Sequence, residues 1–344
     1  MLNKAEIGGD VPEDRISLLE HIVDMGSGRI MITGPVDSGK TFLTTFLAQN
    51  LPSFGTVEVM DSDVGQKSIL PPATITLASV TASFSSLSSL VPKAHYFVGT
   101  VAPEEHIAEM VAGVSFLSRM ANSDYLILDT TGFIEGNGLR LKRLKAEVFG
   151  PNLIVVIGDS YSSERLARAL SDLGEVVRLS PSSHVIPHSR DERRTFRSMK
   201  WTAYFSNSRE IELSLKDIRI FGTDLFGERE MSAEELKLVE KITGWKVLGG
   251  WESGGKYTVL KAGEERRHYP SIKAIDFNSL GNLLLGLIGN GRCLGLGILK
   301  WINIREGILH VLTPVEERID GVIFGRMRVT ETGIELGLLP KNVL

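Results

Sequence analysis

The sequence predicts an α/β protein with a mostly parallel sheet and flanking helices, followed by a smaller, mostly β domain. Two observations carry this prediction. Between about residues 28 and 180, apolar runs alternate with amphipathic segments, which is typical of parallel strands joined by crossover helices. After about residue 206 the pattern changes to short apolar runs separated by glycines and turns, which favours strands joined by short loops.

The α/β part is expected to alternate strands with helices. Its apolar runs are continuous, as in strands buried on both faces of a sheet, and they lie at residues 29–34, 56–61, 94–100, 124–130, 152–159 and 175–180. Helices are expected between them at residues 39–50, 104–121, 139–149 and 162–173. The segment 68–93 is rich in Ser, Thr and Pro, so we expect an extended excursion with short strands over the sheet surface.

These patterns predict an N-terminal extension (1–27), a main domain (28–206) that ends with a helix at about 189–205, and a C-terminal domain (207–344). Within the last, the apolar segment 280–299 is interrupted by polar residues and rich in glycine, so it predicts two strands around a turn rather than a membrane span. The N-terminus is polar and acidic, unlike a signal peptide, and Cys293 is the only cysteine. We therefore expect a soluble, cytoplasmic protein.

Residues 34–41, with the sequence GPVDSGKT, match the phosphate-binding pattern G-x-x-x-x-G-K-[ST]. A predicted strand precedes the match and a predicted helix follows it, which is the context of a P-loop NTPase core. In such a loop backbone N–H groups bind phosphates, the lysine neutralises the β- and γ-phosphates, and the threonine hydroxyl binds Mg²⁺. The sequence therefore predicts binding of ATP and Mg²⁺ through Gly34, Pro35, Asp37, Ser38, Gly39, Lys40, Thr41 and Phe42.

Acidic residues stand at the ends of two predicted strands. Asp61 and Asp63 alternate at the end of the second strand, so their side chains point the same way, and Asp129 lies near the end of the fourth. Ligands of such sheets bind beyond the carboxyl ends of the strands, so these carboxylates are expected to face Lys40 and Mg²⁺. Thr41, Asp61 and Asp129 are the candidate metal ligands. The alternative for each single aspartate is that it caps a turn or a helix.

Two clusters of basic residues accompany this site, although the formal net charge of the chain is −4. Four arginines at spacing i, i+3, i+4 and i+7 share one face of a predicted helix: Arg190, Arg193, Arg194 and Arg197. They favour a lid that closes over phosphates, with a solvated basic face as the alternative. For the second cluster a groove that follows nucleic-acid phosphates and an ordinary exposed helix face are both open: Arg140, Lys142, Arg143 and Lys145.

The order of the motifs resembles one known family. It consists of GPVDSGKT, DSDVGQ, FVGTVAP, DTTGF, an Arg-x-x-x-Arg lid and a late LLGLI…GLGIL…TP, and it is similar to that of the polynucleotide 5′-hydroxyl kinases. That family includes the kinase of the eukaryotic mRNA 3′-end cleavage factor, the nucleolar pre-rRNA processing kinases and their archaeal relatives. The chain looks like the archaeal form, without the N-terminal β domain of the eukaryotic relatives.

The resemblance implies roles in catalysis for four residues. Asp63 would be the general base that takes the proton of the 5′-hydroxyl group. Lys40 would hold the ATP phosphates, and Arg193 and Arg197 would be the two lid arginines that stabilise the transferring phosphoryl group.

It also implies three contacts with the nucleic acid. Gln66 would bind the water shell of the metal or the acceptor strand. Phe133 takes the place of an aromatic residue that supports the terminal nucleotide, with simple packing as the alternative. Pro103 belongs to the Thr-x-Pro clasp of the family, in which this chain has Val101 instead of the threonine.

The function that these residues and the resemblance imply is an ATP-dependent polynucleotide 5′-hydroxyl kinase, which transfers the γ-phosphate to the 5′-OH end of RNA, DNA or both. Its partners would be nucleic-acid ends and a nucleoside triphosphate, and no membrane. One alternative is an ATP-binding scaffold in RNA processing that has no catalytic activity. Another is a P-loop NTPase or kinase whose substrate is not a nucleic acid. A GTPase is disfavoured because the chain has no Asn-Lys-x-Asp motif.

Overall fold

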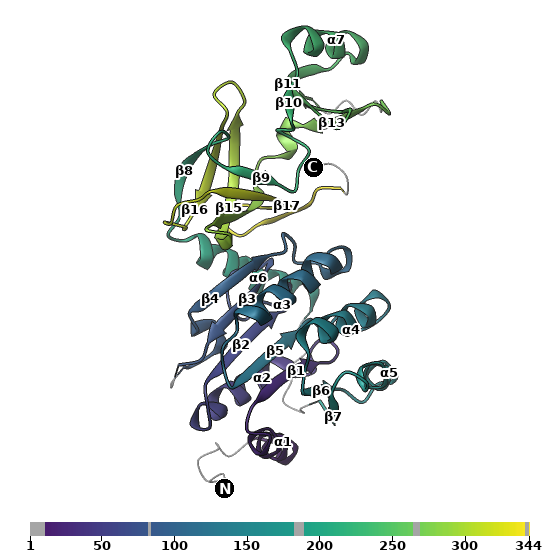
Figure 1. The fold of residues 1–344 in the computed structure, drawn as a ribbon, viewed down its shortest axis with the longest axis vertical. Coiled ribbons are helices and arrows are strands. Elements are labelled where there is room, and N and C mark those ends of the chain that lie inside the picture. The colour runs from purple at the N-terminus through teal and green to yellow at the C-terminus, as the bar shows by residue number, and fades with distance from the viewer. Residues whose placement is uncertain (1–10, 82–83, 182–188, 264–268, 341–343) are drawn as a thin grey trace. The chain divides into compact units, whose positions relative to one another are not determined.

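The computed structural model describes residues 11–81, 84–181, 189–263, 269–340 and 344. Its contacts divide the chain into two units, Met1–Arg197 and Ser198–Leu344. The predicted fold class is confirmed, because the first unit is a helix-flanked, mostly parallel sheet and the second is mostly β (Figure 1). The division falls inside helix α6 (Arg190–Phe205), and the domain boundary expected after residue 206 lies just beyond the end of that helix.

The sheet of the first unit has the strand order β4-β3-β2-β5-β1-β6-β7. Its strands are β1 (Gly28–Thr33), β2 (Val57–Ser62), β3 (Thr74–Ser79), β4 (Pro92–Phe97), β5 (Tyr125–Thr130), β6 (Leu153–Ile157) and β7 (Glu175–Leu179). The five strands from β2 to β7 in this order pair in parallel, while β3 is antiparallel to both β2 and β4. All six strands predicted for this part of the chain are present.

Strand β3 corrects one prediction. It lies within the sheet, between β2 and β4, rather than over the sheet surface. Five of its six residues are buried even though two of them are threonines. Their hydroxyl groups are satisfied inside the protein, since Thr74 Oγ1 donates to Pro71 O and Thr76 Oγ1 bonds with His95 Nδ1. The polar composition of segment 68–93 therefore did not indicate that it contains a buried strand.

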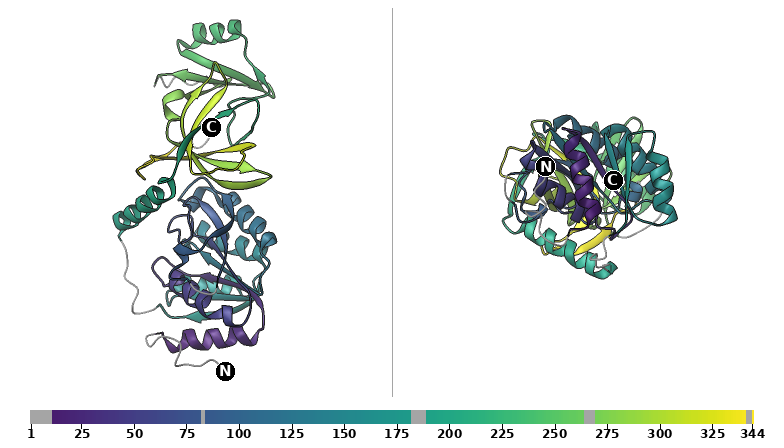
Figure 2. Two further views of the ribbon diagram at one scale, coloured as in Figure 1. Left: turned by 90° about the vertical axis from the view of Figure 1, so that its left-hand side faces the viewer. Right: turned by 90° about the horizontal axis from the view of Figure 1, so that it is seen from below.

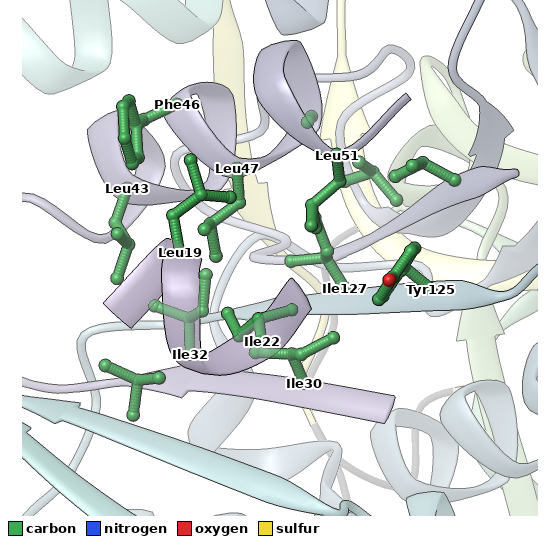
Figure 3. Packing of buried hydrophobic residues seen from close by; sticks show 14 of the residues in the cluster. Leu19, Ile22, Ile30, Ile32, Leu43, Phe46, Leu47, Leu51, Tyr125 and Ile127 are labelled. Carbon is green, nitrogen blue, oxygen red and sulfur yellow. The ribbon is translucent and has the colours of Figure 1, made fainter. Parts of the chain in front are cut away.

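Helices cover both faces of this sheet (Figure 1). On one face lie α1 (Glu13–Asp24) and α2 (Lys40–Asn50), which share a core with β1 and β5. Figure 3 shows this core, with Leu19 and Ile22 from α1, Leu43 and Leu47 from α2, and Ile30, Ile32 and Ile127 from the sheet. On the other face lie α3 (Ile107–Met120), α4 (Asn137–Phe149) and α5 (Tyr161–Leu170). Three single-turn 3₁₀ helices complete the unit: η1 (Leu51–Ser53), η2 (Leu87–Ser89) and η3 (Pro103–Glu105).

The second unit contains a main sheet and a smaller one. The main sheet pairs β8 (Arg209–Ser214), β16 (Ile308–Thr313), β15 (Arg292–Asn303), β14 (Leu283–Gly289), β17 (Gly321–Val329) and β18 (Glu335–Leu338), with β9 (Arg219–Phe221) against β17. The smaller sheet has the order β10 (Arg229–Glu230), β11 (Lys246–Ser253), β12 (Lys256–Ala262), β13 (Ile272–Asp276), and η4 (Phe277–Ser279) follows it. Helix α7 (Ala233–Thr243), green in Figure 2, packs beside this small sheet.

The segment 280–299 forms two antiparallel strands, β14 and β15, as predicted. They meet at Asn290 and Gly291, which both have positive φ angles of 51° and 73° and so form the tight turn that joins such strands. Within the described ranges, no helix is long and apolar enough to cross a membrane.

Candidate active site

The phosphate-binding motif forms a loop between β1 and α2. Asp37 and Gly39 both have left-handed backbone conformations, with φ angles of 53° and 92°. A change of backbone handedness turns successive N–H groups into a concavity that accepts an anion at the start of the helix. Gly34 is required by space, since a Cβ atom there would lie 2.3 Å from the carbonyl oxygen of Ile157. The strand, loop and helix expected from the sequence are therefore all present.

Lys40 is the first residue of α2 and is buried. Its ammonium group folds back onto its own loop, where Nζ donates to the carbonyl oxygen of Pro35 and lies 3.5 Å from Ser38 Oγ. Burial lowers the pKa of Lys40, and the nearby carboxylates of Asp129, Asp63 and Asp37 oppose this shift. The structure thus gathers this lysine and these carboxylates around one loop.

Thr41 and Asp129 form a polar pair next to Lys40. Thr41 Oγ1 donates to Asp129 Oδ2 over 3.2 Å, and Asp129 is only 2% exposed. Its other oxygen, Oδ1, is buried and has no hydrogen-bond partner in the part of the chain that the structure describes. Burial, followed by the charge of Asp61, raises the pKa of Asp129 to about 7, and Lys40 opposes this rise.

This pair fits a magnesium ion. An unpartnered buried carboxylate oxygen next to a threonine hydroxyl is an oxygen donor set of the kind that Mg²⁺ takes. Among the described residues no group of three or more His, Cys, Asp or Glu side chains could enclose a metal. A P-loop site does not need such a group, because phosphates and water supply the remaining ligands. Thr41 and Asp129 are therefore suited to an ion that enters with a nucleotide.

Asp61 lies opposite Asp129, because the parallel strands β2 and β5 pair Asp61 with Asp129 and Ser62 with Thr130. Both of its carboxylate oxygens are engaged by the chain that follows. Oδ1 accepts from the N–H group of Asp63 and lies 3.5 Å from Lys67 Nζ. Oδ2 accepts from two more backbone N–H groups, those of Ser68 at 2.7 Å and Ile69 at 2.9 Å. This carboxylate folds the loop after β2 back on itself.

Asp63 begins the loop that follows β2 and is half-buried. Its Oδ1 accepts from the N–H groups of Gly65 and Gln66, both at 2.9 Å. No hydrogen bond reaches Oδ2 from any residue within the described ranges. One oxygen is thus fixed by the turn while the other is available to a substrate. The side chain of Gln66 is half-buried beside this turn.

Three lysines at this site are buried, which the sequence analysis did not predict. Lys67, Lys142 and Lys145 are all fully buried, and burial lowers the pKa of each, to about 7 for Lys145. The two open interpretations of residues 140–145 were both wrong for Lys142 and Lys145, which face neither solvent nor a groove. The spacing of residues along α4 could have indicated this burial, because its buried residues follow a helical repeat: Gly138, Leu141, Lys142, Lys145, Ala146 and Phe149.

The arginine-rich helix is present as α6, and Arg193 and Arg197 are half-buried while Arg190 and Arg194 are exposed. Arg193 Nη1 lies 3.2 Å from Asp37 Oδ2, so this arginine reaches the phosphate-binding loop.

The remaining candidate residues also lie in the first unit. Phe133 is half-buried and packs against the core on the α3–α4 face of the sheet. Next to it, a Cβ atom on Gly132 would lie 2.6 Å from the Val36 backbone, so this loop touches the phosphate-binding loop. Pro103 is the buried first residue of η3. Thr100 Oγ1 accepts from the N–H group of Ala102. Phe42 is 47% exposed.

The chain is similar to several known proteins. A family model described as the P-loop of the mRNA cleavage and polyadenylation factor CLP1 matches residues 34–207. A polyribonucleotide 5′-hydroxyl-kinase of Thermococcus kodakarensis is 48% identical and aligns over 100% of both chains. One of Pyrococcus abyssi is 44% identical over 99% of each chain. The solved structure of a Clp1p–Pcf11p complex has a TM-score of 0.60 at 14% identity and covers 92% of this chain and 79% of that chain, which shows a shared fold. The resemblance found in the motifs is confirmed.

Proposed function

The chain belongs to the family of the CLP1 P-loop, and from this premise we propose that it is an ATP-dependent polynucleotide 5′-hydroxyl kinase. The enzyme would transfer the γ-phosphate of ATP to the 5′-OH end of RNA, DNA or both. One observation carries the proposal: Asp63 presents a carboxylate oxygen with no bond in the described chain, directly after the strand that pairs with the Asp129 strand beside Lys40 and Thr41. A non-catalytic scaffold needs only the phosphate-binding loop.

ATP would bind through the phosphate-binding loop and the start of α2. Its phosphates would take the place of the Pro35 carbonyl as the partner of Lys40, whose buried ammonium group then has a full negative charge to neutralise. The N–H groups of the loop would bind the phosphate oxygens. The residues involved are Gly34, Pro35, Asp37, Ser38, Gly39, Lys40, Thr41 and Phe42.

Thr41 and Asp129 would hold Mg²⁺, in agreement with the unpartnered Oδ1 atom of Asp129. When bound, the ion neutralises the charge on the β- and γ-phosphates. Asp61 would have a structural role, since three N–H groups and Lys67 already engage its oxygens.

Asp63 would act as the general base through its Oδ2 atom. It would accept the proton of the 5′-hydroxyl group while that oxygen attacks the γ-phosphorus atom and the bond to the β–γ bridging oxygen breaks, which releases ADP. Arg193 and Arg197 would stabilise the charge on the transferring phosphoryl group. Gln66, Pro103 and Phe133 would contact the acceptor strand.

The test is an assay with γ-labelled ATP and three acceptors: 5′-OH RNA, 5′-OH DNA and none. We expect label to appear on a nucleic-acid end. Lys40→Ala should abolish the transfer, and Asp63→Asn should lower kcat by about 10²- to 10⁴-fold, the range that general-base catalysis contributes.

The matched control is Asp124→Asn. Asp124 precedes β5 at its amino end and bonds with Thr56, away from the carboxyl end that carries Asp129, so this variant should keep its activity. Release of phosphate that does not depend on the acceptor would instead identify an NTPase. The absence of any turnover would favour a scaffold, and near-normal transfer by Asp63→Asn would show that Asp63 is not the base.

A further inference from the structure

Two lysines of α4 are buried behind the candidate active site. Lys142 and Lys145 are both 0% exposed, and each ammonium group bonds with a residue that directly follows or ends a strand of the sheet. Lys142 Nζ donates to the carbonyl oxygen and the hydroxyl group of Thr131, which follows β5. Lys145 Nζ donates to Ser62 Oγ at 2.9 Å and to Ser62 O at 3.3 Å, at the end of β2.

Stability alone does not explain a lysine at position 145. Removing an ammonium group from water is costly, and a well-packed apolar side chain of similar volume often serves stability as well or better. Apart from Lys142, the other buried residues on the inner face of α4 carry no charge, among them Leu141, Ala146 and Phe149. An apolar residue would therefore continue this face. The ammonium group of Lys145 has to be explained by what it contacts.

The contacts of Lys145 continue through Ser62 to Asp129. Ser62 Oγ accepts from Lys145 Nζ and donates to the carbonyl oxygen of Asp129 over 2.8 Å. The direction of these bonds is fixed, because an ammonium group only donates and a hydroxyl group has a single proton to pass on. Ser62 also stands directly between Asp61 and Asp63 in the chain. One chain of hydrogen bonds therefore joins α4 to the strand before Asp63 and to the backbone of Asp129.

We propose that Lys145 is a positioning residue for phosphoryl transfer: through Ser62, it fixes the carboxylate of Asp63 relative to the Thr41–Asp129 pair. This inference rests on the proposed kinase activity. The reaction requires the attacking oxygen, its base and the phosphate to be aligned at the same time. Asp63 lies in a loop after β2, where its carboxylate bonds only with the N–H groups of Gly65 and Gln66, while its own N–H group donates to Asp61 Oδ1. The β2–β5 pairing holds Ser62 beside Thr130, and the Lys145–Ser62 contact adds a bond from α4 to the residue directly before Asp63.

The test compares Lys145→Met, Ser62→Ala and the double variant in steady-state kinetics and in thermal unfolding. Each single substitution should lower kcat by about 10- to 100-fold, the effect of a small misplacement of a reacting group. The KM for ATP should stay within about twofold, because neither residue touches the phosphate-binding loop. The melting temperature of Lys145→Met measures separately what the ammonium group contributes to stability.

The double variant tests the chain of contacts itself. If Lys145 acts through Ser62, the double variant should be no slower than the slower single variant. Ser62→Thr retains the hydroxyl group and should keep more activity than Ser62→Ala. The control is Arg143→Met on the same helix, because Arg143 bonds with Asp172 and Glu147 near the surface and should leave kcat unchanged.

Three outcomes would overturn the inference. Lys145→Met could keep its kcat within about twofold of the unsubstituted chain, or the losses of the two single variants could multiply in the double variant. If Lys145→Met does not fold, Ser62→Ala decides alone, and an unchanged kcat in that variant refutes the role of Ser62.

If the unsubstituted chain labels 5′-OH RNA while these variants label it equally fast, only this inference fails. If the unsubstituted chain labels no acceptor, the proposed kinase activity fails and this inference with it.

Discussion

At the scale of single residues, Asp129 is a buried carboxyl group with a shifted pKa. Its surroundings oppose ionisation, since burial and the charge of Asp61 raise its pKa to about 7. A carboxyl group has to be ionised to bind a metal, so a bound cation would favour the ionised form of Asp129 and lower its pKa. Without a cation, the folded chain keeps a proton on Asp129 at pH values at which the unfolded chain, with an ordinary pKa of 3.8, has lost it. Stability therefore falls as the pH rises through this interval.

We predict that this loss of stability depends on the Asp129 carboxyl group. In a chelating buffer, the melting temperature of the unsubstituted chain should fall relative to that of Asp129→Asn between about pH 5 and about pH 8. Mg²⁺ with ATP should reduce the difference, because it binds the ionised form. The other titrating groups, such as Lys145, are present in both proteins and contribute little to the comparison. Parallel melting curves for the two proteins over this range would contradict the prediction.

At the scale of elements, the sequence predicts most of the first unit. Strands with continuous apolar runs, such as β1 and β6, and helices with a regular apolar face, such as α5, lie close to their expected positions. Strand β4 ends at Phe97 rather than at residue 100, because the chain turns at Gly99, which has a φ angle of 78°. The expected helix at 104–121 begins later, at Ile107, since Pro103–Glu105 form a separate 3₁₀ turn.

The candidate site is predictable only in part, for a physical reason. The phosphate-binding loop, Asp63 and Asp129 could be predicted to lie together, because a short sequence motif or the end of a predicted strand identifies each of them. The burial of Lys67, Lys142 and Lys145 was not predicted, because their partners lie on other elements or are backbone atoms. A lysine is ordinarily exposed, so composition alone argues against burial. Only the helical repeat of buried positions along α4 distinguishes Lys145 from its exposed neighbour Arg140.

Helix α1 was assigned to the N-terminal extension, yet it contributes to the core. Leu19 is 0% exposed and packs in the cluster that α2 and the sheet share (Figure 3). We predict that Leu19→Ala lowers the free energy of unfolding by about 2–5 kcal/mol, as for other large-to-small changes in a core. The KM for ATP should not change. Chemical denaturation measures the effect, and Leu238→Ala, at a position that is 57% exposed on α7, is the control. An equal, small effect of both changes would show that α1 does not contribute to the core.

At the scale of the whole molecule, one helix belongs to both units. The first half of α6 carries Arg193 and Arg197, while its second half is anchored within the C-terminal unit. There Trp201 is fully buried, Thr202 Oγ1 donates to Thr332 O, and the Tyr204 hydroxyl group accepts from the N–H group of Leu296. The segment that carries Arg193 and Arg197 is therefore continuous with a helical segment held within the C-terminal unit.

We predict that Ser198→Pro lowers kcat more than it raises the KM for ATP. Proline removes one helical N–H group, and its ring clashes with the carbonyl group four residues earlier, so it kinks the helix just after Arg197. Thr195→Ala, which keeps the backbone intact on the same helix, is the control and should have little effect. Labelling of 5′-OH RNA over a range of ATP concentrations separates the two constants. A kcat equal to that of the control would show that the helix does not need to be continuous.

The register of β2 against β5 has a consequence for how this protein can change over time. The two strands place Asp61 opposite Asp129 and Ser62 opposite Thr130. The face of the sheet to which each side chain points therefore depends on its position along β2. Loss or gain of a single residue inside that strand would turn every later side chain to the other face of the sheet. A substitution in β2 keeps this register, whereas an insertion or deletion keeps it only when it falls in a neighbouring loop. The length of this strand therefore determines which side chains reach the site at its end.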